Sequence, residues 1–278
     1  ATTPVPPQLS GTLLGESGIS ETGGPLDPQR GTGEALFEYE ICLKCHSYNT
    51  NKPQVPGYQV YGPLPNRQMP STDLRQAFTS PASFHPVINP RGLSVGPGGD
   101  VSSLLSAVVD GSGAPIVSRP LSPSSQIYCI DCHSSDTGRN LGAGNTGPAG
   151  PHGSNVNHIL ERNYVIESPT GTPGYTASLP YSSSNYALCF KCHSEQSLRN
   201  NESFSAHDDH MQFSSCSTCH DPHGVPGGTA SGNAALINFD LNIVAPSSSG
   251  RLEFQHTGLH QGTCYLRCHG EDHNPKSY

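Results

Sequence analysis

Apolar residues along this chain follow a helical or strand period only over short stretches. Residues 34–46, "EALFEYEICLKCH", contain good helix formers and predict a short helix that runs into a cysteine–histidine motif. A second helix is predicted over residues 100–111, with Asp100 as its N-cap and Gly111 as its end. Its apolar face would consist of Leu104, Leu105, Val108 and Val109. Helices are therefore expected to be few and short.

Strand alternation is visible near the C-terminus. In "LINFDLNI", residues 236–243, apolar residues alternate with mainly polar ones, and "RLEF" at 251–254 could pair with this strand across the intervening turn. A small hairpin is therefore predicted in the segment 235–278. Residues 1–33 are rich in Pro, Gly and Thr without periodicity and predict an extended N-terminal arm. The remainder, residues 34–278, is expected to be a single domain.

Composition limits how much of the fold a hydrophobic core can hold together. Only 33% of the residues are hydrophobic, there is no Trp, and Gly and Pro number 31 and 26. Such a composition predicts a mostly irregular chain with a few short helices and the small C-terminal hairpin. Something besides apolar burial must then order it, and the ten cysteines are the candidate.

Four of the cysteine pairs share one spacing, Cys-x-x-Cys-His. Paired Cys-x-x-Cys segments can bind zinc, but zinc does not require a histidine directly after every second cysteine. Covalent attachment of a c-type haem uses this motif, because two thiols one turn apart reach both porphyrin vinyl groups and the adjacent imidazole lies beneath the iron. Four haems c are therefore predicted, with thioethers and proximal ligands from Cys42, Cys45 and His46; Cys129, Cys132 and His133; Cys189, Cys192 and His193; and Cys216, Cys219 and His220.

The motifs also suggest an internal repeat and an uneven spacing. "YEICLKCHS" at 39–47 and "YALCFKCHS" at 186–194 share one pattern, which indicates a repeated haem-binding unit. Cys189 and Cys216 are close in sequence, so the last two haems are expected to lie close together.

Each iron needs a sixth ligand, and its identity tunes the reduction potential. The chain has two Met but fourteen His, so two-histidine ligation is the economical prediction. An open sixth position would instead indicate catalysis on a small ligand. The distal candidates are His85 before a proline, His152 and His223 in repeated Pro-His-Gly phrases, and His207 and His210 one helical turn apart.

A fifth cysteine pair has one residue too many. Cys264-x-x-x-Cys268-His269 could hold a fifth haem if its turn is helical. The same spacing can bring two cysteines within disulfide range, and unpaired cysteines are unusual in exported proteins. Because four credible distal histidines match four regular motifs, four haems and a Cys264–Cys268 disulfide are favoured, and five haems are the alternative.

Charge and terminal sequence bear on location and partners. "ATTPVPPQLSG" is typical of a mature end left after removal of a signal peptide, and no apolar run approaches the length of a membrane helix. The expectation is an exported protein with no membrane span. The formal net charge is -8 and only 14 Lys and Arg are scattered along the chain, so nucleic acid is not an expected partner.

The chain resembles multihaem c-type cytochromes of the doubled Cys-x-x-Cys-His, cytochrome c3-like type, and especially extracellular cytochromes that form conductive filaments (nanowires). The matching pieces are "CLKCHS", "SFHPV", "CIDCH", "GPHGS", "YALCFKCHS", "HDDHMQFSSCSTCHDPHG" and "LINFD…GRLEF…CYLRCHG". The resemblance implies a stack of haems with two histidine ligands each, subunits joined head to tail, and one haem that takes its distal histidine from the next subunit.

The resemblance also implies a function without substrate chemistry, which is electron transfer along the haems in an extracellular or cell-surface filament. Its partners would be other copies of this chain, redox proteins and extracellular electron acceptors. The alternatives are a monomeric periplasmic or surface shuttle and, from another class, a multihaem reductase. The reductase would need an iron with an open ligand position, and the Cys-x-x-Cys-Lys variant that often marks one is absent from this sequence.

Overall fold

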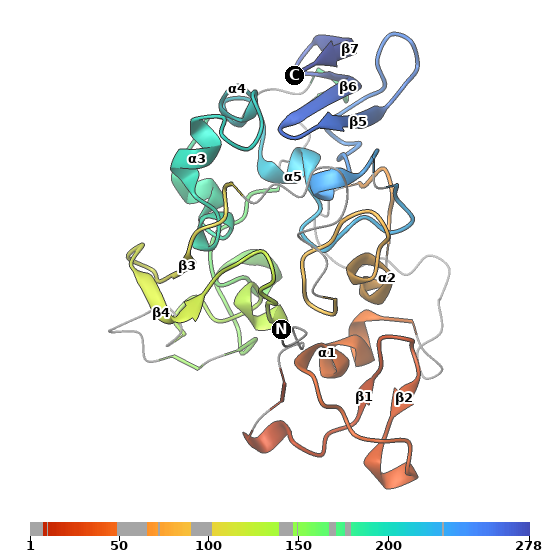
Figure 1. Ribbon diagram of the computed structural model, residues 1–278, viewed down its shortest axis with the longest axis vertical. Coiled ribbons are helices and arrows are strands. Elements are labelled where there is room, and N and C mark those ends of the chain that lie inside the picture. Colours follow the sequence, from red (N-terminus) through yellow and green to blue (C-terminus); the bar gives the residue numbers. More distant parts are fainter. Residues whose placement is uncertain are drawn as a thin grey trace.

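The computed structural model describes residues 8–9, 11–48, 66–71, 73–89, 102–138, 147–148, 150–166, 171–175, 179–229 and 231–278. Over these residues the chain is mostly coil, with five short α-helices and three small antiparallel sheets (Figure 1). The prediction of a largely irregular fold with few helices is confirmed. In Figure 1 the hairpin β1–β2 and the C-terminal sheet lie at opposite ends of the longest axis.

The regular elements are short throughout. The α-helices are α1 Glu38–His46, α2 Leu74–Phe78, α3 Glu195–Arg199, α4 His207–Met211 and α5 Cys216–Cys219. The 3₁₀ turns are η1 Gly11–Leu13, η2 Pro28–Arg30, η4 Cys129–Asp131, η6 Asn157–Ile159, η7 Ser183–Tyr186, η8 Cys189–Lys191 and η9 Ala234–Leu236. The strands are β1 Gly18–Ile19, β2 Pro25–Leu26, β3 Ala107–Val109, β4 Pro115–Pro120, β5 Glu253–Gly258, β6 Gln261–Cys268 and β7 Glu271–Ser277.

The helix predicted over residues 34–46 is confirmed as α1. Its N-terminus is fixed by the Glu40 carboxylate, which accepts hydrogen bonds from the N–H groups of Leu36 (2.8 Å) and Phe37 (3.0 Å). Tyr39 and Leu43 then lie on its buried face. This face packs into a core cluster that α2 and the following loop complete with Phe78, Val87 and Ile88.

The N-terminal segment differs from the predicted extended arm. Within residues 11–33, β1 pairs with β2 and packs against α1, and Ile19 belongs to the same core cluster as Tyr39. The close approach depends on Gly18, where an added Cβ would lie 2.9 Å from the Ala35 Cβ. The segment is therefore folded onto the domain. Its sequence has no periodicity, but burial of Ile19 and the close approach at Gly18 hold it against α1.

The helix predicted over residues 100–111 is wrong in its described part. Residues 107–109 form strand β3, which pairs antiparallel with β4. The turn between the strands is closed by the Asp110 carboxylate, which accepts hydrogen bonds from the N–H groups of Ser112 (2.8 Å) and Ala114 (3.0 Å). Adjacent β-branched residues favour the strand, and Val108 is its buried member. Asp100, the predicted N-cap, lies outside the described residues.

The C-terminal β structure exists, but other residues form it. Strands β5, β6 and β7 make a three-stranded antiparallel sheet in sequence order, whereas residues 236–243 turn. Ala235 and Leu236 adopt left-handed φ values of 52° and 64°, and the Asp240 carboxylate accepts the N–H groups of Asn66 and Asn242. Of the alternating apolar residues, Phe239 and Ile243 are buried and Ile237 and Leu241 are half-buried. The two buried residues belong to a core cluster shared with the sheet: Ala234, Phe239, Ile243, Val244, Phe254 and Leu266.

Candidate functional site

The four regular motifs fold alike, each as one helical turn. The first closes α1, the second and third begin η4 and η8, and the fourth forms α5. In the last three, the N–H of the motif histidine donates to the carbonyl of the first motif cysteine at 2.9 Å: His133 to Cys129, His193 to Cys189, and His220 to Cys216. One turn thus gathers two thiols and one imidazole, which is the geometry that attachment to a porphyrin edge requires.

Each of the last three motifs is held by a short segment from elsewhere in the chain. The segment provides an oxygen to the Nδ1 atom of the motif histidine: the His158 carbonyl to His133 (2.9 Å), the Ser103 hydroxyl to His193 (3.1 Å), and the Ala235 carbonyl to His220 (2.7 Å). The same segments donate an N–H to the carbonyl of the second cysteine: Glu161 to Cys132 (2.9 Å), Leu105 to Cys192 (2.8 Å), and Asn238 to Cys219 (2.8 Å). The three motifs are therefore docked in one common way.

Two of these hydrogen-bond acceptors are carbonyls of strained backbone. His158 and Ala235 are not glycines, yet their φ values are 63° and 52°. Left-handed conformations cost such residues on the order of 1 kcal/mol or more and cluster at functional sites. Here the strained residues present the carbonyls that orient His133 and His220, a signal that the sequence does not contain.

Three predicted distal histidines each face a different motif histidine. The ring centroids are 6.1 Å apart for His133 and His223, 6.5 Å for His193 and His85, and 6.4 Å for His220 and His207. An iron bound by two imidazole nitrogens at about 2.0 Å each would place the ring centroids roughly 6.3 Å apart. The three pairs therefore have the separation that one iron between two histidines demands.

In five of the six rings of these pairs, Nδ1 lies within hydrogen-bond distance of an oxygen, and His223 is the exception. On the distal side, Nδ1 of His85 lies 2.5 Å from the Pro222 carbonyl, Nδ1 of His207 lies 2.9 Å from the Ser203 hydroxyl, and Nδ1 of His223 lies 3.8 Å from the Asp221 carboxylate. A partner on Nδ1 fixes the ring and leaves Nε2 as the nitrogen that would bind a metal. This arrangement is typical of histidine ligands.

Burial keeps five of the six paired histidines neutral. Desolvation lowers the pKa of His85, His133 and His220, and it lowers the pKa of His193 and His223 to about 4. A metal binds the neutral imidazole, so these rings are in the required form at neutral pH.

The remaining distal candidates behave differently. His152 is exposed, and among the described residues no imidazole lies at pair distance from it. His210 faces His273 with ring centroids 6.3 Å apart, and the Tyr278 hydroxyl lies 3.4 Å from Nε2 of His210 and 3.2 Å from Nδ1 of His273. The distal role of His152 stays a prediction. His273 and Tyr278 were not among the predicted site residues, because no repeat in the sequence marks them.

The motifs follow one another in space in their sequence order. The Cys42 and Cys129 thiols of motifs one and two share a hydrogen bond, which lowers the pKa of Cys42 and raises that of Cys129. A hydrogen bond between the Cys189 and Cys216 thiols links motifs three and four and raises the pKa of Cys189. Between them, the Lys191 ammonium of motif three donates to the Asp131 carbonyl of motif two at 2.6 Å. Each motif is therefore a neighbour in space of the motif that follows it in sequence.

One acidic residue, Glu38, lies at the contact between motifs one and two. The ligand atoms of Glu38, Cys42 and Cys129 all lie within 4.8 Å of one another, close enough to hold a metal ion. Two of the three belong to the motif cysteines, so this cluster is part of the same site. Glu38 itself was not singled out from the sequence, because it lies before the motif.

The fifth cysteine pair is not built like the others. Cys264 and Cys268 lie on the extended strand β6 and are not joined to each other. Residues four apart on a strand have Cα atoms about 13 Å apart, whereas a disulfide needs them within about 7 Å. The predicted Cys264–Cys268 disulfide is therefore wrong. The fifth-haem alternative stays a prediction, on a segment without the helical turn of the other motifs and with Nε2 of His269 2.7 Å from the Ser214 hydroxyl.

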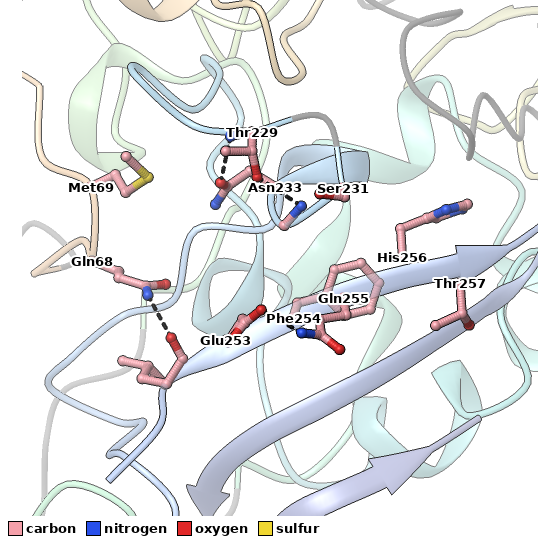
Figure 2. A pocket seen from close by; sticks show the side chains of 12 residues that line it. Gln68, Met69, Thr229, Ser231, Asn233, Glu253, Phe254, Gln255, His256 and Thr257 are labelled. Carbon is pink, nitrogen blue, oxygen red and sulfur yellow. Dashed lines mark hydrogen bonds between the residues drawn. The ribbon is translucent and has the colours of Figure 1, made fainter.

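A cavity of about 460 Å³ lies beside the C-terminal sheet, apart from the motifs (Figure 2). Its described lining comes from residues 68–69, 229, 231–233 and 252–257, none of which belongs to a cysteine motif. Much of the polar lining is already bonded internally, as Gln68 is to the Leu252 carbonyl and Gln255 is to Glu253. Met69 lines this cavity, which contains no motif residue, so Met69 is not positioned to replace a distal histidine.

Comparison with protein-family models, curated proteins and solved structures gives no match. Among the described residues, no helix combines the length and the apolar character that crossing a membrane requires.

Proposed function

We propose that this protein transfers electrons along a row of covalently bound c-type haems, each with two histidine ligands to its iron. The observation that carries the proposal is the set of three imidazole pairs at 6.1 to 6.5 Å, each joining a motif histidine to a distant histidine. Zinc or redox dithiols would not require such pairs beside every one of these motifs.

Each group of residues would have a separate role in binding the haems. The motif cysteines would form the thioethers, the motif histidines would be proximal ligands, and His85, His207 and His223 would be distal ligands. The bound haem would supply a one-electron change at iron. The chain itself would fix the imidazoles through their Nδ1 partners and bury them. With both axial positions filled by histidine, the arrangement favours electron transfer over substrate chemistry.

A head-to-tail filament is the assembly we propose, and it rests on the resemblance to filament-forming cytochromes. Support comes from motif one, where Cys45 and His46 are exposed at the end of α1. His152 is exposed too, so a contact between copies would allow it to serve as a ligand to a neighbouring subunit. An open head-to-tail contact of this kind propagates without closing.

Intact mass of the denatured protein tests the haem count, and four covalent haems are expected. Absorption and electron paramagnetic resonance (EPR) spectra should show low-spin iron throughout. A protein without covalent haem would refute the proposal, and high-spin iron with turnover of nitrite or sulfite would favour a reductase. Electron microscopy of the secreted material then separates a filament from a monomeric shuttle.

A further inference from the structure

Arg67 is a largely buried cation that donates hydrogen bonds to the backbone of the fourth motif. Its side chain is 9% exposed. One terminal nitrogen of the guanidinium donates to the carbonyls of Ser217 (2.6 Å) and Asn238 (2.8 Å), and the other donates to the carbonyl of His220 (2.9 Å). Ser217 lies inside the motif, His220 is its histidine, and Asn238 belongs to the segment that docks it. The planar fork thus ties three backbone positions of one site together.

The residues directly after this motif serve more than one imidazole pair. His220 faces His207, and three residues later His223 faces His133. Between them, the Pro222 carbonyl accepts a hydrogen bond from Nδ1 of His85, and the His85 ring faces the histidine of motif three. The run 220–223 therefore contributes to all three imidazole pairs.

Asp221 fixes the other side of this run. Its carboxylate accepts the N–H of His223 at 3.1 Å and the side-chain amide of Asn238 at 3.3 Å. The Nε atom of Arg67 lies 3.7 Å from the same carboxylate. The largely buried Arg67 and the partly buried Asp221 therefore hold the segment between them, with the cation on the His220 carbonyl and the anion on the His223 N–H.

We propose that Arg67 is a positioning residue for the iron ligands His220 and His223 and, as a fixed buried charge, raises the reduction potential of the haems that they hold. The inference rests on the proposed function. Reduction adds an electron to each iron, and a nearby cation stabilises the reduced form. Because Arg67 is buried, salt and water screen this effect far less than they screen a surface charge. Asp221 opposes it, so removal of Arg67 also uncovers a negative charge, and both changes lower the potential.

The test is EPR-monitored redox titration of the haem-loaded protein. In Arg67→Gln, which removes the charge and keeps amide donors, two of the four haems should become harder to reduce by about tenfold in equilibrium constant, or about 59 mV for a one-electron couple. Arg67→Lys keeps the charge and loses the fork, so the potentials should stay near wild type while the EPR signature of ligand orientation changes. Arg30→Gln is the matched control, because it changes the net charge equally on a side chain that is 77% exposed.

Asp221 provides an independent arm. Asp221→Asn should raise the potentials of the same two haems, and the double variant Arg67→Gln/Asp221→Asn should return them towards wild type. Equal titration curves for Arg67→Gln and Arg30→Gln, or a uniform shift of all haems, would overturn the inference. Intact mass and the low-spin spectrum of the wild type decide the proposed function separately. If Arg67→Gln does not fold, Arg67→Lys and Asp221→Asn still decide the outcome.

Discussion

The imidazole of His223 lies parallel to that of His133, with 4° between the ring planes and 6.1 Å between the centroids. His133 belongs to the second motif, whereas His223 lies three residues after the histidine of the fourth. The rings of Phe78 and His223 pack edge to face, with centroids 5.6 Å apart and 86° between the planes, and the His158 carbonyl lies 2.9 Å from Nδ1 of His133. The two rings are thus fixed from several elements before any metal is considered.

Replacement of His223 should open one iron. In His223→Ala we expect one haem of four to change from low-spin to high-spin, because its distal ligand is removed while its thioethers remain. EPR and absorption spectra of the oxidised protein measure this change. His256→Ala is the control, since His256 lines the cavity beside the C-terminal sheet and belongs to none of the three pairs. A fully low-spin His223→Ala protein would contradict the pairing.

Removal of one motif cysteine should weaken attachment of one haem only. We expect Cys216→Ala to lose a thioether in motif four, which intact mass and the shifted absorption of a singly attached haem would reveal. Cys264→Ala should keep the wild-type haem count, because the strand geometry of β6 does not gather its two cysteines as a motif turn does. Loss of a haem in Cys264→Ala would instead support five haems.

The buried ion pair between motifs two and three should matter for stability. The Lys191 ammonium lies 2.8 Å from the Glu161 carboxylate, and the two side chains are 5% and 0% exposed. Lys191→Met should lower the free energy of unfolding by about 3 kcal/mol, because it leaves a buried carboxylate with less compensation. Chemical denaturation measures the loss.

Motif one supplies the matched control for that substitution. Lys44 occupies the same position of its motif as Lys191, but it is exposed and bonds to the Ser17 hydroxyl at 2.9 Å. Lys44→Met should therefore change the free energy of unfolding by less than about 1 kcal/mol. The double variant Lys191→Met/Glu161→Gln should recover much of the loss. Equal effects of Lys44→Met and Lys191→Met would contradict the role of burial.

Glu38 should make stability depend on pH near neutrality. Burial raises the pKa of its carboxyl from 4.5 to about 7. Between these values the native state binds more protons than the unfolded state, so the free energy of unfolding falls as the pH rises, by at most roughly 3 kcal/mol. Glu38→Gln should remove this dependence in denaturation series from pH 4.5 to 7.5. The exposed Glu34→Gln should retain it, and a Glu38→Gln profile that overlays wild type would refute the assignment.

Gly224 should be hard to replace because His223 precedes it. Its φ is 139°, and an added Cβ would collide with the carbonyl oxygen of Ala77 and lie 2.8 Å from the Phe84 Cβ. We expect Gly224→Ala to cost about 2 kcal/mol or more and to perturb the spectrum of the His223 site. Gly250→Ala separates strain from crowding, since Gly250 also has a positive φ but open space around it. Similar costs for both variants would contradict the clash.

The sequence did not predict how segments that are distant along the chain pack against one another. The helix over residues 34–46 was predictable because its signals are local, whereas the strand β3 arose where a helix was expected, since a turn at Asp110 and the partner β4 decided it. Likewise, the alternation over residues 236–243 predicted a strand, but Asp240 and two left-handed residues turn the chain there.

The sequence by itself predicted the motif turns, because the spacing Cys-x-x-Cys-His brings two thiols and an imidazole together wherever the local backbone is helical. It also narrowed the distal histidines to five candidates. Only the tertiary structure decided which candidate faces which motif, and it brought Arg67, Ser103 and Ala235 to the site from distant segments. The reason is physical: a distal ligand and its supports are defined by distance across the fold, and spacing along the chain carries no record of that distance.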